Sequence, residues 1–165
     1  MSGVEVRPLS RLPASGKARV ERVAGNEAAA SLRLVTVVFE WRGAVDDAEI
    51  EALHAEAFGH EPTAFDWRSQ LERHSLGWVC ARDDDGLVGF VNVPWDGARH
   101  AFLVDTIVAA RARHRRVGTR LVALAVEGAR AAGCAWLHVD FEPELLPFYL
   151  EAARFRPTPA GLIRL

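Results

Sequence analysis

The chain has 165 residues, of which 50% are hydrophobic and 25% charged, and its formal net charge is −2. This length and composition fit one globular domain with a sizeable core. The near-neutral charge argues against a broadly basic surface for nucleic acid. Because the sequence contains neither a run of 18 apolar residues nor an N-terminal hydrophobic signal core, we expect no membrane association and a cytoplasmic location.

Metal and disulfide sites are not expected. The two cysteines, Cys80 and Cys134, are too few and too far apart for a disulfide framework or a zinc site. Each lies in an apolar run, which favours a reduced and buried thiol. The acidic triplet at residues 83–85 has no further oxygen ligands at the offsets of a calcium loop, so we interpret it as a solvated turn.

The first thirty residues differ in character from the rest. Residues 1–30 mix proline, serine, glycine and scattered charges without helical or strand periodicity. We predict a disordered extension there, followed by a single domain at residues 31–165. A transit peptide is the alternative, because the segment contains four arginines, but its three glutamates count against that interpretation.

The next segments predict one strand and two helices. Residues 32–42 alternate apolar and polar side chains, which is typical of a strand with one apolar face. Asp46 followed by Glu49 resembles a capping box, so a helix should begin there and run to about Phe58. A second, short helix is expected through Trp67.

The second half of the chain alternates strand and helix patterns. These are two hairpin strands at 78–82 and 87–95, a strand at 101–108, a helix at 117–132, a strand at 135–141, a helix at 144–153 and one or two closing strands at 155–165. Because a strand, a helix and a strand follow one another, the strands on either side of the long helix should be parallel and joined by a right-handed crossover. The order predicts an α/β (α+β) domain with a mixed sheet.

A basic turn opens the long helix. A helix N-terminus leaves four N–H groups without intrahelical partners and carries a partial positive charge, so it attracts anions. Gly118 would let a ligand approach the backbone closely. The cations that crowd this turn are Arg111, Arg113, His114, Arg115, Arg116 and Arg120. The pattern predicts a pyrophosphate site; a solvated basic turn is the alternative, and binding to a nucleic-acid backbone is disfavoured because the charge is confined to one turn.

This turn resembles a family signature. The run from Arg113 to Gly118, RHRRVG, is similar to the motif Gln/Arg-x-x-Gly-x-Gly/Ala of the GNAT superfamily of acyl-CoA-dependent N-acyltransferases. Arg116 replaces the first glycine, and it could either crowd the backbone cradle or supply a cation to the coenzyme. Residues 148–157, FYLEAARFRP, resemble the FYxxxGF segment of the family, with Ala153 and Arg154 where a small residue and glycine are usual.

The resemblance spans residues 31–165 and carries several expectations. It implies a mixed central sheet of about six to seven strands flanked by about four helices, with the fourth and fifth strands splayed around the pantetheine arm. Acetyl-CoA would be the co-substrate. The residues expected to contact it are Ile107 and Val108, through their backbone, and Arg113, His114, Arg115, Arg116, Val117, Gly118 and Thr119.

Two residues are candidates for catalysis. By resemblance, Tyr149 of the Phe-Tyr pair would protonate the coenzyme sulfur; the alternative is that its ring only packs. Asp105 alternates with Leu103 and Ile107 on one strand face, where partial desolvation would raise its pKa and suit it to accept a proton. Its alternative role is as a structural partner for an arginine or a backbone N–H.

Other polar and aromatic side chains leave two interpretations open. His138 alternates out of an apolar strand, which favours a hydrogen-bonded core histidine over the alternative of a ligand or base. The histidines of the first two helices, His54, His60 and His74, could touch the substrate or simply lie on helix surfaces. Phe58, Trp67 and Trp95 could line the acceptor mouth, although core packing is the usual fate of such rings.

The sequence therefore predicts an acetyl-CoA-dependent N-acetyltransferase that acts on a primary amine of a small molecule or protein. A non-catalytic acyl-CoA-binding regulatory module with the same fold is the alternative. A homodimer is a possible assembly, and neither nucleic acid nor membrane is expected as a partner.

Overall fold

The computed structural model describes residues 19–23 and 35–165. The elements are β1 (Arg19–Val23), β2 (Val35–Trp41), α1 (Asp47–Phe58), α2 (Trp67–His74), β3 (Ser75–Asp83), β4 (Gly86–Pro94), β5 (His100–Phe102), β6 (Val104–Val108), the 3-10 turn η2 (Ala110–Ala112), α3 (Val117–Ala131), β7 (Trp136–His138), the 3-10 turn η3 (Pro143–Leu145) and the π-helical turn η4 (Pro147–Ala152). None of these helices is long and apolar enough to cross a membrane.

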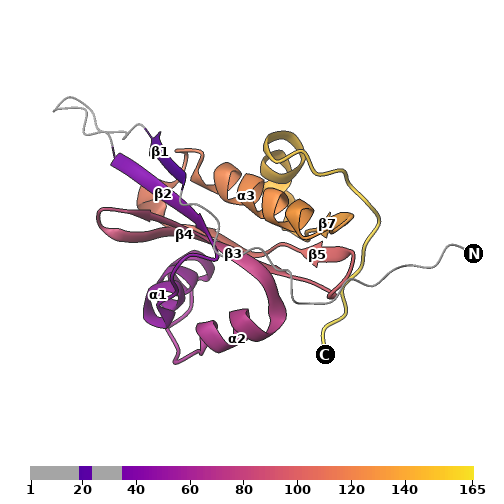
Figure 1. Ribbon diagram of the computed structural model, residues 1–165, viewed down its shortest axis with the longest axis horizontal. Coiled ribbons are helices and arrows are strands. Elements are labelled where there is room, and N and C mark those ends of the chain that lie inside the picture. The colour runs from indigo at the N-terminus through magenta and orange to yellow at the C-terminus, as the bar shows by residue number, and fades with distance from the viewer. Residues whose placement is uncertain (1–18, 24–34) are drawn as a thin grey trace, which may run out of the picture.

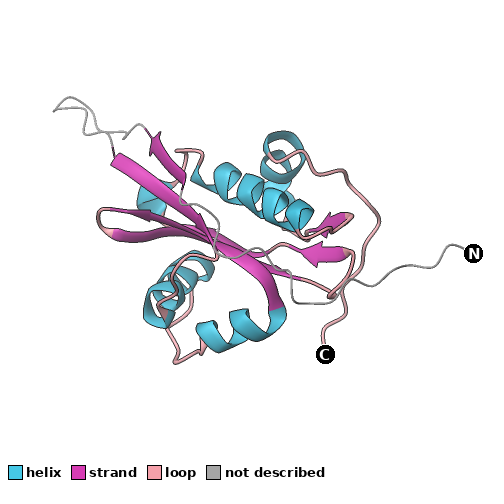
Figure 2. Cartoon of the chain, viewed as in Figure 1, coloured by secondary structure: helices cyan, strands magenta, loops and turns pink. Residues whose placement is uncertain are grey.

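Two sheets form the centre of the molecule. The larger has five antiparallel strands in the order β1-β2-β3-β4-β6, and the smaller consists of β5 and β7 in parallel. Helices α1 and α2 cover one face of the large sheet and α3 lies against the other (Figures 1 and 2). This arrangement confirms the predicted mixed α/β class.

Strands β3 and β4 are buried along most of their length because helices cover both faces of the sheet. The tightest packing surrounds Trp41 at the end of β2. A Cβ atom added to Gly77 on β3 would lie 2.3 Å from the Trp41 ring, and one added to Gly128 on α3 would lie 2.6 Å from it. The two glycines therefore hold the indole between strand and helix.

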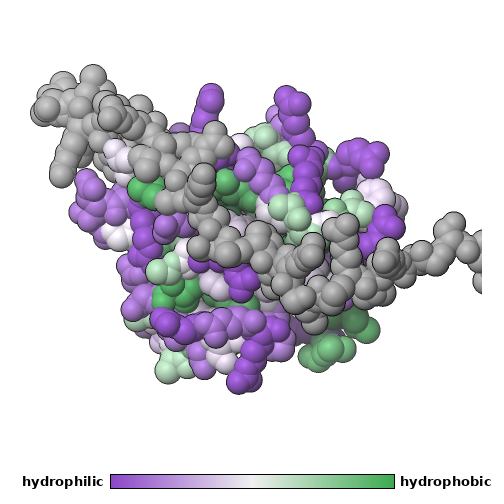
Figure 3. Space-filling view, viewed as in Figure 1, coloured by the Kyte–Doolittle hydropathy of each residue, from purple (hydrophilic) through white to green (hydrophobic). Residues whose placement is uncertain are grey.

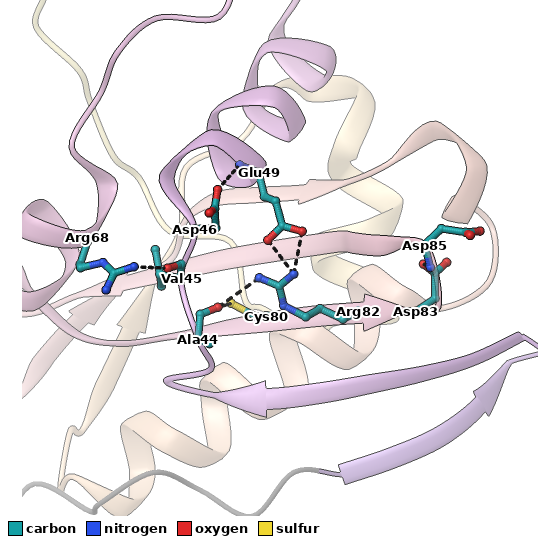
Figure 4. Close-up of polar contacts among 9 residues, drawn as sticks. All are labelled: Ala44, Val45, Asp46, Glu49, Arg68, Cys80, Arg82, Asp83 and Asp85. Atoms are coloured by element: carbon teal, nitrogen blue, oxygen red, sulfur yellow. Dashed lines mark hydrogen bonds and ion pairs between the residues drawn. The ribbon is translucent and has the colours of Figure 1, made fainter.

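The start of α1 follows the predicted cap, with one difference. Asp46 accepts a hydrogen bond from the Glu49 backbone N–H at 3.0 Å, as an N-cap should. The Glu49 carboxylate does not complete a capping box; both of its oxygens accept from Nη1 of Arg82 on β3, at 2.7 and 2.9 Å (Figure 4). Arg82 also donates to the Ala44 carbonyl at 3.2 Å, so this arginine ties the beginning of α1 to the sheet.

The predicted disorder of residues 1–30 is wrong for Arg19–Val23. These residues form β1, which pairs antiparallel with β2 from Arg19 opposite Phe39 to Val23 opposite Val35. The backbone groups on the open edge of β2 supply this strand with partners, and local composition cannot reveal such a tertiary pairing. The remainder of the predicted extension, residues 1–18 and 24–30, lies outside the described residues.

The segment predicted as one strand at 101–108 is divided at Leu103. Before it, β5 pairs in parallel with β7; after it, β6 pairs antiparallel with β4. The Leu103 N–H donates to the His138 carbonyl at 2.8 Å, at the point of division. The parallel pairing across the long helix is thus confirmed for β5 and β7. The predicted fourth and fifth strands separate beyond Leu103, as the splayed arrangement requires.

The end of the chain departs from the prediction. The helix expected at 144–153 is replaced by η3 and η4, each of which begins at a proline. The closing strands expected at 155–165 are wrong, because no strand forms there. Pro157 and Pro159 each lack a backbone donor for a sheet ladder. Leu162 and Ile163 are 87% and 84% exposed, and Figure 3 shows strongly hydrophobic atoms beside the C-terminal end.

Candidate active site

An irregularity in β6 lies at the centre of the candidate site. Asn92 of β4 pairs with Val104, and Phe90 pairs with Ile107, so three steps along β6 match two along β4. An extra residue of this kind is a β-bulge. Within it Asp105 has a φ of 52°, a left-handed conformation that costs a residue with a Cβ about 1–2 kcal/mol. Such strain is concentrated at functional sites.

The Asp105 carboxylate faces an imidazole and a buried amide. Its Oδ1 lies 3.8 Å from Nε2 of His54 on α1. Burial raises the pKa of Asp105, and the neighbouring His54 and Asn92 side chains partly offset that effect. Asn92 is fully buried and accepts from Ser75 at 2.6 Å, while its Nδ2 has no hydrogen-bond partner of ordinary geometry among the described residues. The partner of Asp105 is therefore a histidine, where an arginine or a backbone N–H had been considered.

Aromatic rings surround His54. The Phe58 ring centroid is 4.5 Å from that of His54, and the Trp67 centroid is 5.3 Å away. Phe58 is 59% exposed whereas Trp67 is 6% exposed. Of the three aromatic residues considered for the acceptor mouth, Phe58 is thus exposed enough to line an opening, whereas Trp67 is packed in the core. Trp95 instead forms an isolated bridge with Ala101 beside β5.

A buried carboxylate fixes the loop next to these rings. Glu51 on α1 accepts hydrogen bonds from the N–H and the hydroxyl of Thr63, both at 2.7 Å, and from the Trp67 indole at 2.9 Å. These bonds lower the pKa of Glu51 to about 2. The residue stays ionised at neutral pH and fastens the loop between α1 and α2. Its type gave no signal of this role in the sequence, because a glutamate on a helix is usually solvated.

Tyr149 lies inside an aromatic cluster. Its ring stacks on Phe141 at 4.6 Å and meets Phe148 edge-on at 4.8 Å. It is 5% exposed, and burial raises the pKa of its phenol, an effect that the nearby Thr106 hydroxyl partly offsets. The buried Thr106 oxygen is close to the phenol yet has no hydrogen-bond partner of ordinary geometry among the described residues. Tyr149 is thus placed beside β6, as an acid at this site would be, while its ring also packs.

Some cations of the basic turn bind other protein groups, whereas others form no ion pair among the described residues. Arg111 pairs with Asp83 in the β3–β4 turn, and Arg113 donates from Nε to the Val108 carbonyl at 3.2 Å. Arg115 and Arg116 make no ion pair with the described residues. The remaining predicted contacts line the start of α3 and its approach: Ile107 and Val117 are buried, Val108 and Thr119 are half-buried, and His114 is exposed.

The start of α3 fits an anion. No side chain of the described residues caps this helix end, so the N–H groups of its first turn remain directed outward. A Cβ at Gly118 would lie 3.2 Å from the Phe148 ring, which accounts for glycine there. Arg116 precedes the helix with a φ of 62° and is exposed. The arginine therefore adopts the left-handed conformation that glycine favours, and the turn keeps its shape.

The other candidates fall away from this site. His138 was predicted to be a hydrogen-bonded histidine of the core. It is hydrogen-bonded, with its Nε2 2.8 Å from His100 Nδ1. The core position is wrong: the residue is exposed, because β5 and β7 form a sheet of only two strands with an open face. It stacks on His100 at a centroid distance of 5.1 Å. Cys80 is buried and Cys134 half-buried, both as free thiols. Within residues 19–23 and 35–165, no group of three or more His, Cys, Asp or Glu side chains could hold a metal ion.

Comparison with known proteins gives one family and many similar folds. The fold is similar to that of a GNAT-family acetyltransferase, SP0256, from Streptococcus pneumoniae, with 19% identity, coverage of 78% of this chain and 97% of that one, and a TM-score of 0.64. Glucosamine-6-phosphate N-acetyltransferase from Arabidopsis thaliana is 13% identical to this chain. The match covers 77% of this chain and 97% of that one, with a TM-score of 0.59. An aminoglycoside N-acetyltransferase, in complex with CoA, is 17% identical. That match covers 81% of this chain and 96% of the other, with a TM-score of 0.62.

No curated protein matches the sequence. The model of the acetyltransferase (GNAT) family, however, matches residues 41–152. This span runs from the end of β2 through the bulge of β6, the basic turn and Tyr149. The chain belongs to the GNAT acetyltransferase family.

Proposed function

We propose that the protein transfers the acetyl group of acetyl-CoA directly to a primary amine. The observation that carries this proposal is the uncapped start of α3, beside which lie Gly118 and two arginines, Arg115 and Arg116, that form no ion pair with the described residues. Helix α3 packs on the bulged strand β6, which contains Asp105. An anion site at the start of α3 and a partly desolvated carboxylate on the neighbouring strand β6 suit a reaction between a phosphorylated acyl carrier and an amine. The N-acetyltransferases with a similar fold are named for amine-bearing acceptors.

In this proposal the coenzyme pyrophosphate binds the first turn of α3. The N–H groups from Val117 to Thr119 donate to it, and Arg115 and Arg116 supply positive charge. The pantetheine arm then extends along the backbone of Ile107 and Val108, where β6 and β7 diverge.

The chemistry requires little beyond positioning. The amine nitrogen attacks the thioester carbon, a nitrogen–carbon bond forms and the carbon–sulfur bond breaks. Asp105 accepts a proton from the amine, for which its raised pKa suits it. The Tyr149 phenol gives a proton to the departing thiolate.

Calorimetric titration with acetyl-CoA and CoA tests the coenzyme site. We expect micromolar affinity, and an Arg115→Ala, Arg116→Ala double variant should bind about tenfold or more weakly, because two cations are lost from a charged ligand. Arg73→Ala, on the exposed end of α2, is the control for loss of surface charge. Unchanged affinity in the double variant would remove the phosphate assignment.

A second experiment concerns Tyr149. Tyr149→Phe keeps the ring and its stacking but removes the phenolic proton, so turnover should fall while the affinity for acetyl-CoA stays the same. The alternative function is a non-catalytic acyl-CoA-binding module, and the enclosure of Tyr149 between aromatic rings favours it. Tight binding of acetyl-CoA without acetylation of any amine in a broad panel would support that module and contradict the transferase.

A further inference from the structure

Two histidines connect Asp105 to the surface. His54 Nδ1 lies 2.7 Å from His60 Nε2, and His60 Nδ1 lies 2.8 Å from the Glu61 carbonyl oxygen. On the opposite side of its ring, His54 Nε2 lies 3.8 Å from Asp105 Oδ1. His60 is exposed, whereas the His54 and Asp105 side chains are 23% and 25% exposed. The three side chains form a row from the bulge of β6 to solvent.

The hydrogen bonds fix where the protons lie. A carbonyl oxygen only accepts, so His60 carries its proton on Nδ1. The Nε2 of neutral His60 is then an acceptor, and His54 must donate to it from Nδ1. Neutral His54 consequently has a lone pair on Nε2, directed toward Asp105. The sequence spacing of the two histidines, six residues apart, gave no sign of this arrangement.

A lone pair facing an ionised carboxylate is not a stable pairing. One proton between Asp105 and His54 resolves it, carried either by the acid or by the imidazole. A separation of 3.8 Å is too long for a direct hydrogen bond, so the transfer takes place through one water molecule or after a small approach of the two side chains. Both groups are exposed enough for a water molecule to reach them.

We propose that Asp105, His54 and His60 form a relay that carries a proton from the acceptor amine to solvent. The inference rests on the proposed acetyl transfer and adds to it the route by which an ammonium substrate is deprotonated. Only Asp105 would touch the amine; His54 and His60 act through it as positioning residues.

The protons balance along this route. A protonated amine loses two protons on becoming an amide, and the departing thiolate gains one from Tyr149, which recovers it from the second proton released at nitrogen. One proton per turnover must therefore leave the site. It passes from the ammonium to Asp105 and then to His54 Nε2; the Nδ1 proton of His54 moves to His60 Nε2, and the Nδ1 proton of His60 passes to water.

The surrounding charges are compatible with this direction. On α1, the Glu51 carboxylate is held by Thr63 and Trp67, stays ionised and interacts electrostatically with His60. Asp105 faces them from β6. The side chains from α2 and β4, Trp67 and Asn92, are neutral. Negative charge therefore lies beside each imidazole, and it attracts a proton that moves between them.

Substitution of His54 by asparagine distinguishes a role in proton transfer from a purely structural role. Asparagine keeps a donor near the position of Nδ1, and so can still bond to His60, but it has no nitrogen facing Asp105. We expect kcat/KM for acetyl-CoA and the best acceptor among spermidine, kanamycin and lysine methyl ester to fall about tenfold or more at pH 7, with unchanged affinity for acetyl-CoA. His74→Asn, on the exposed end of α2, should match the unaltered protein.

Two readouts exclude a purely structural role. The acidic limb of the kcat/KM profile should change shape in His54→Asn, because the proton acceptor next to Asp105 is gone, and added imidazole should restore turnover to His54→Ala. An unaltered profile in an active His54→Asn enzyme would overturn the relay while leaving the acetyl transfer intact.

A third readout does not depend on activity. Nitrogen-15 NMR of the full chain should show His54 and His60 both protonated at Nδ1, and Asp105→Asn should change the chemical shift of His54 Nε2. If none of the amines is acetylated, the proposed function fails, yet these spectra still test the shared proton. Protonation of His60 at Nε2, or a His54 Nε2 chemical shift that is the same in Asp105→Asn, would contradict the relay.

Discussion

Replacement of Arg116 by glycine should make the protein more stable. Arg116 stands immediately before α3 with φ 62° and ψ 13°. A side chain with a Cβ in this left-handed region brings that atom too close to the following carbonyl oxygen. Glycine has no Cβ and adopts the same angles without strain. The substitution therefore removes a cost from the folded state while the backbone keeps its shape.

The magnitude is a difference of two effects. Relief of the left-handed conformation is worth about 1–2 kcal/mol, and the extra freedom that glycine has in the unfolded chain takes back about 0.5–1 kcal/mol. Arg116 is exposed and makes no ion pair with the described residues, so its removal forfeits little else. We expect a net gain of about 0.5–1 kcal/mol, which corresponds to a rise in Tm of about 1–4 °C at this chain length.

Urea unfolding and thermal denaturation of the protein without coenzyme measure this difference. Arg116→Ala removes the same charge but keeps a Cβ, and it should leave the free energy of unfolding nearly unchanged. Arg115→Gly alters a neighbour whose φ is not positive, and it should destabilise. Arg154→Gly, at a second left-handed arginine with φ 61°, should stabilise by a similar amount. Equal effects of glycine at positions 115 and 116 would refute the argument from strain.

Two further predictions concern the core and the loop next to the site. Gly128→Ala should lower the free energy of unfolding by up to about 2 kcal/mol, because the new Cβ, 2.6 Å from the Trp41 ring, overpacks the core by about 1–3 kcal/mol, against a gain in helix propensity of about 1 kcal/mol; an increase in Tm would contradict this packing. Glu51→Gln should lower the free energy of unfolding by about 2 kcal/mol at pH 7. The NH2 group of the amide replaces one carboxylate oxygen and then faces a donor of Thr63 or Trp67, which loses its acceptor. The pKa of Glu51 is lowered in the folded protein to about 2, below its ordinary 4.5, so its contribution is present above pH 4.5 and is lost as the pH falls toward 2. Urea titrations should show the difference between Glu51→Gln and the unaltered protein shrinking over that interval, and a constant difference would mean that Glu51 stabilises by another route.

Most helices and strands of the domain could be predicted from the sequence, because they depend on patterns of neighbouring residues. The Asp46 cap, the alternation along β2 and the apolar stripe of α3 each depend on residues within one turn or one strand. The strand β1 and the replaced closing strands were not readable. Whether Arg19–Val23 forms a strand depends on the free edge of β2, and whether residues 155–165 do depends on a partner that the local pattern does not specify.

The candidate site shows the same division between local and long-range information. Gly118 and Asp105 could be singled out because their residue types and neighbours carry chemical meaning. The row from Asp105 through His54 to His60 could not, since it joins β6 to α1 and to a loop whose position depends on the buried carboxylate of Glu51. A histidine on a helix surface has no local feature that distinguishes a relay from a solvated ring.

Two arginines occupy positions where glycine is expected, and the backbone there keeps the conformation typical of glycine although the residue type differs. The family resemblance places glycine at positions 116 and 154, and the chain has arginine at both. Both arginines nevertheless adopt φ values near 60°, the conformation for which glycine would be suited. Backbone shape at these turns is therefore imposed by the packing of the adjacent helix and sheet, and the substituted residues bear the strain. Asp105 and His114 are also left-handed, so three of the five left-handed non-glycine residues that the structure describes, Asp105, His114 and Arg116, belong to the proposed coenzyme and proton sites. An enzyme that keeps an unfavourable backbone there is more readily explained by a ligand it must hold than by the stability of its fold.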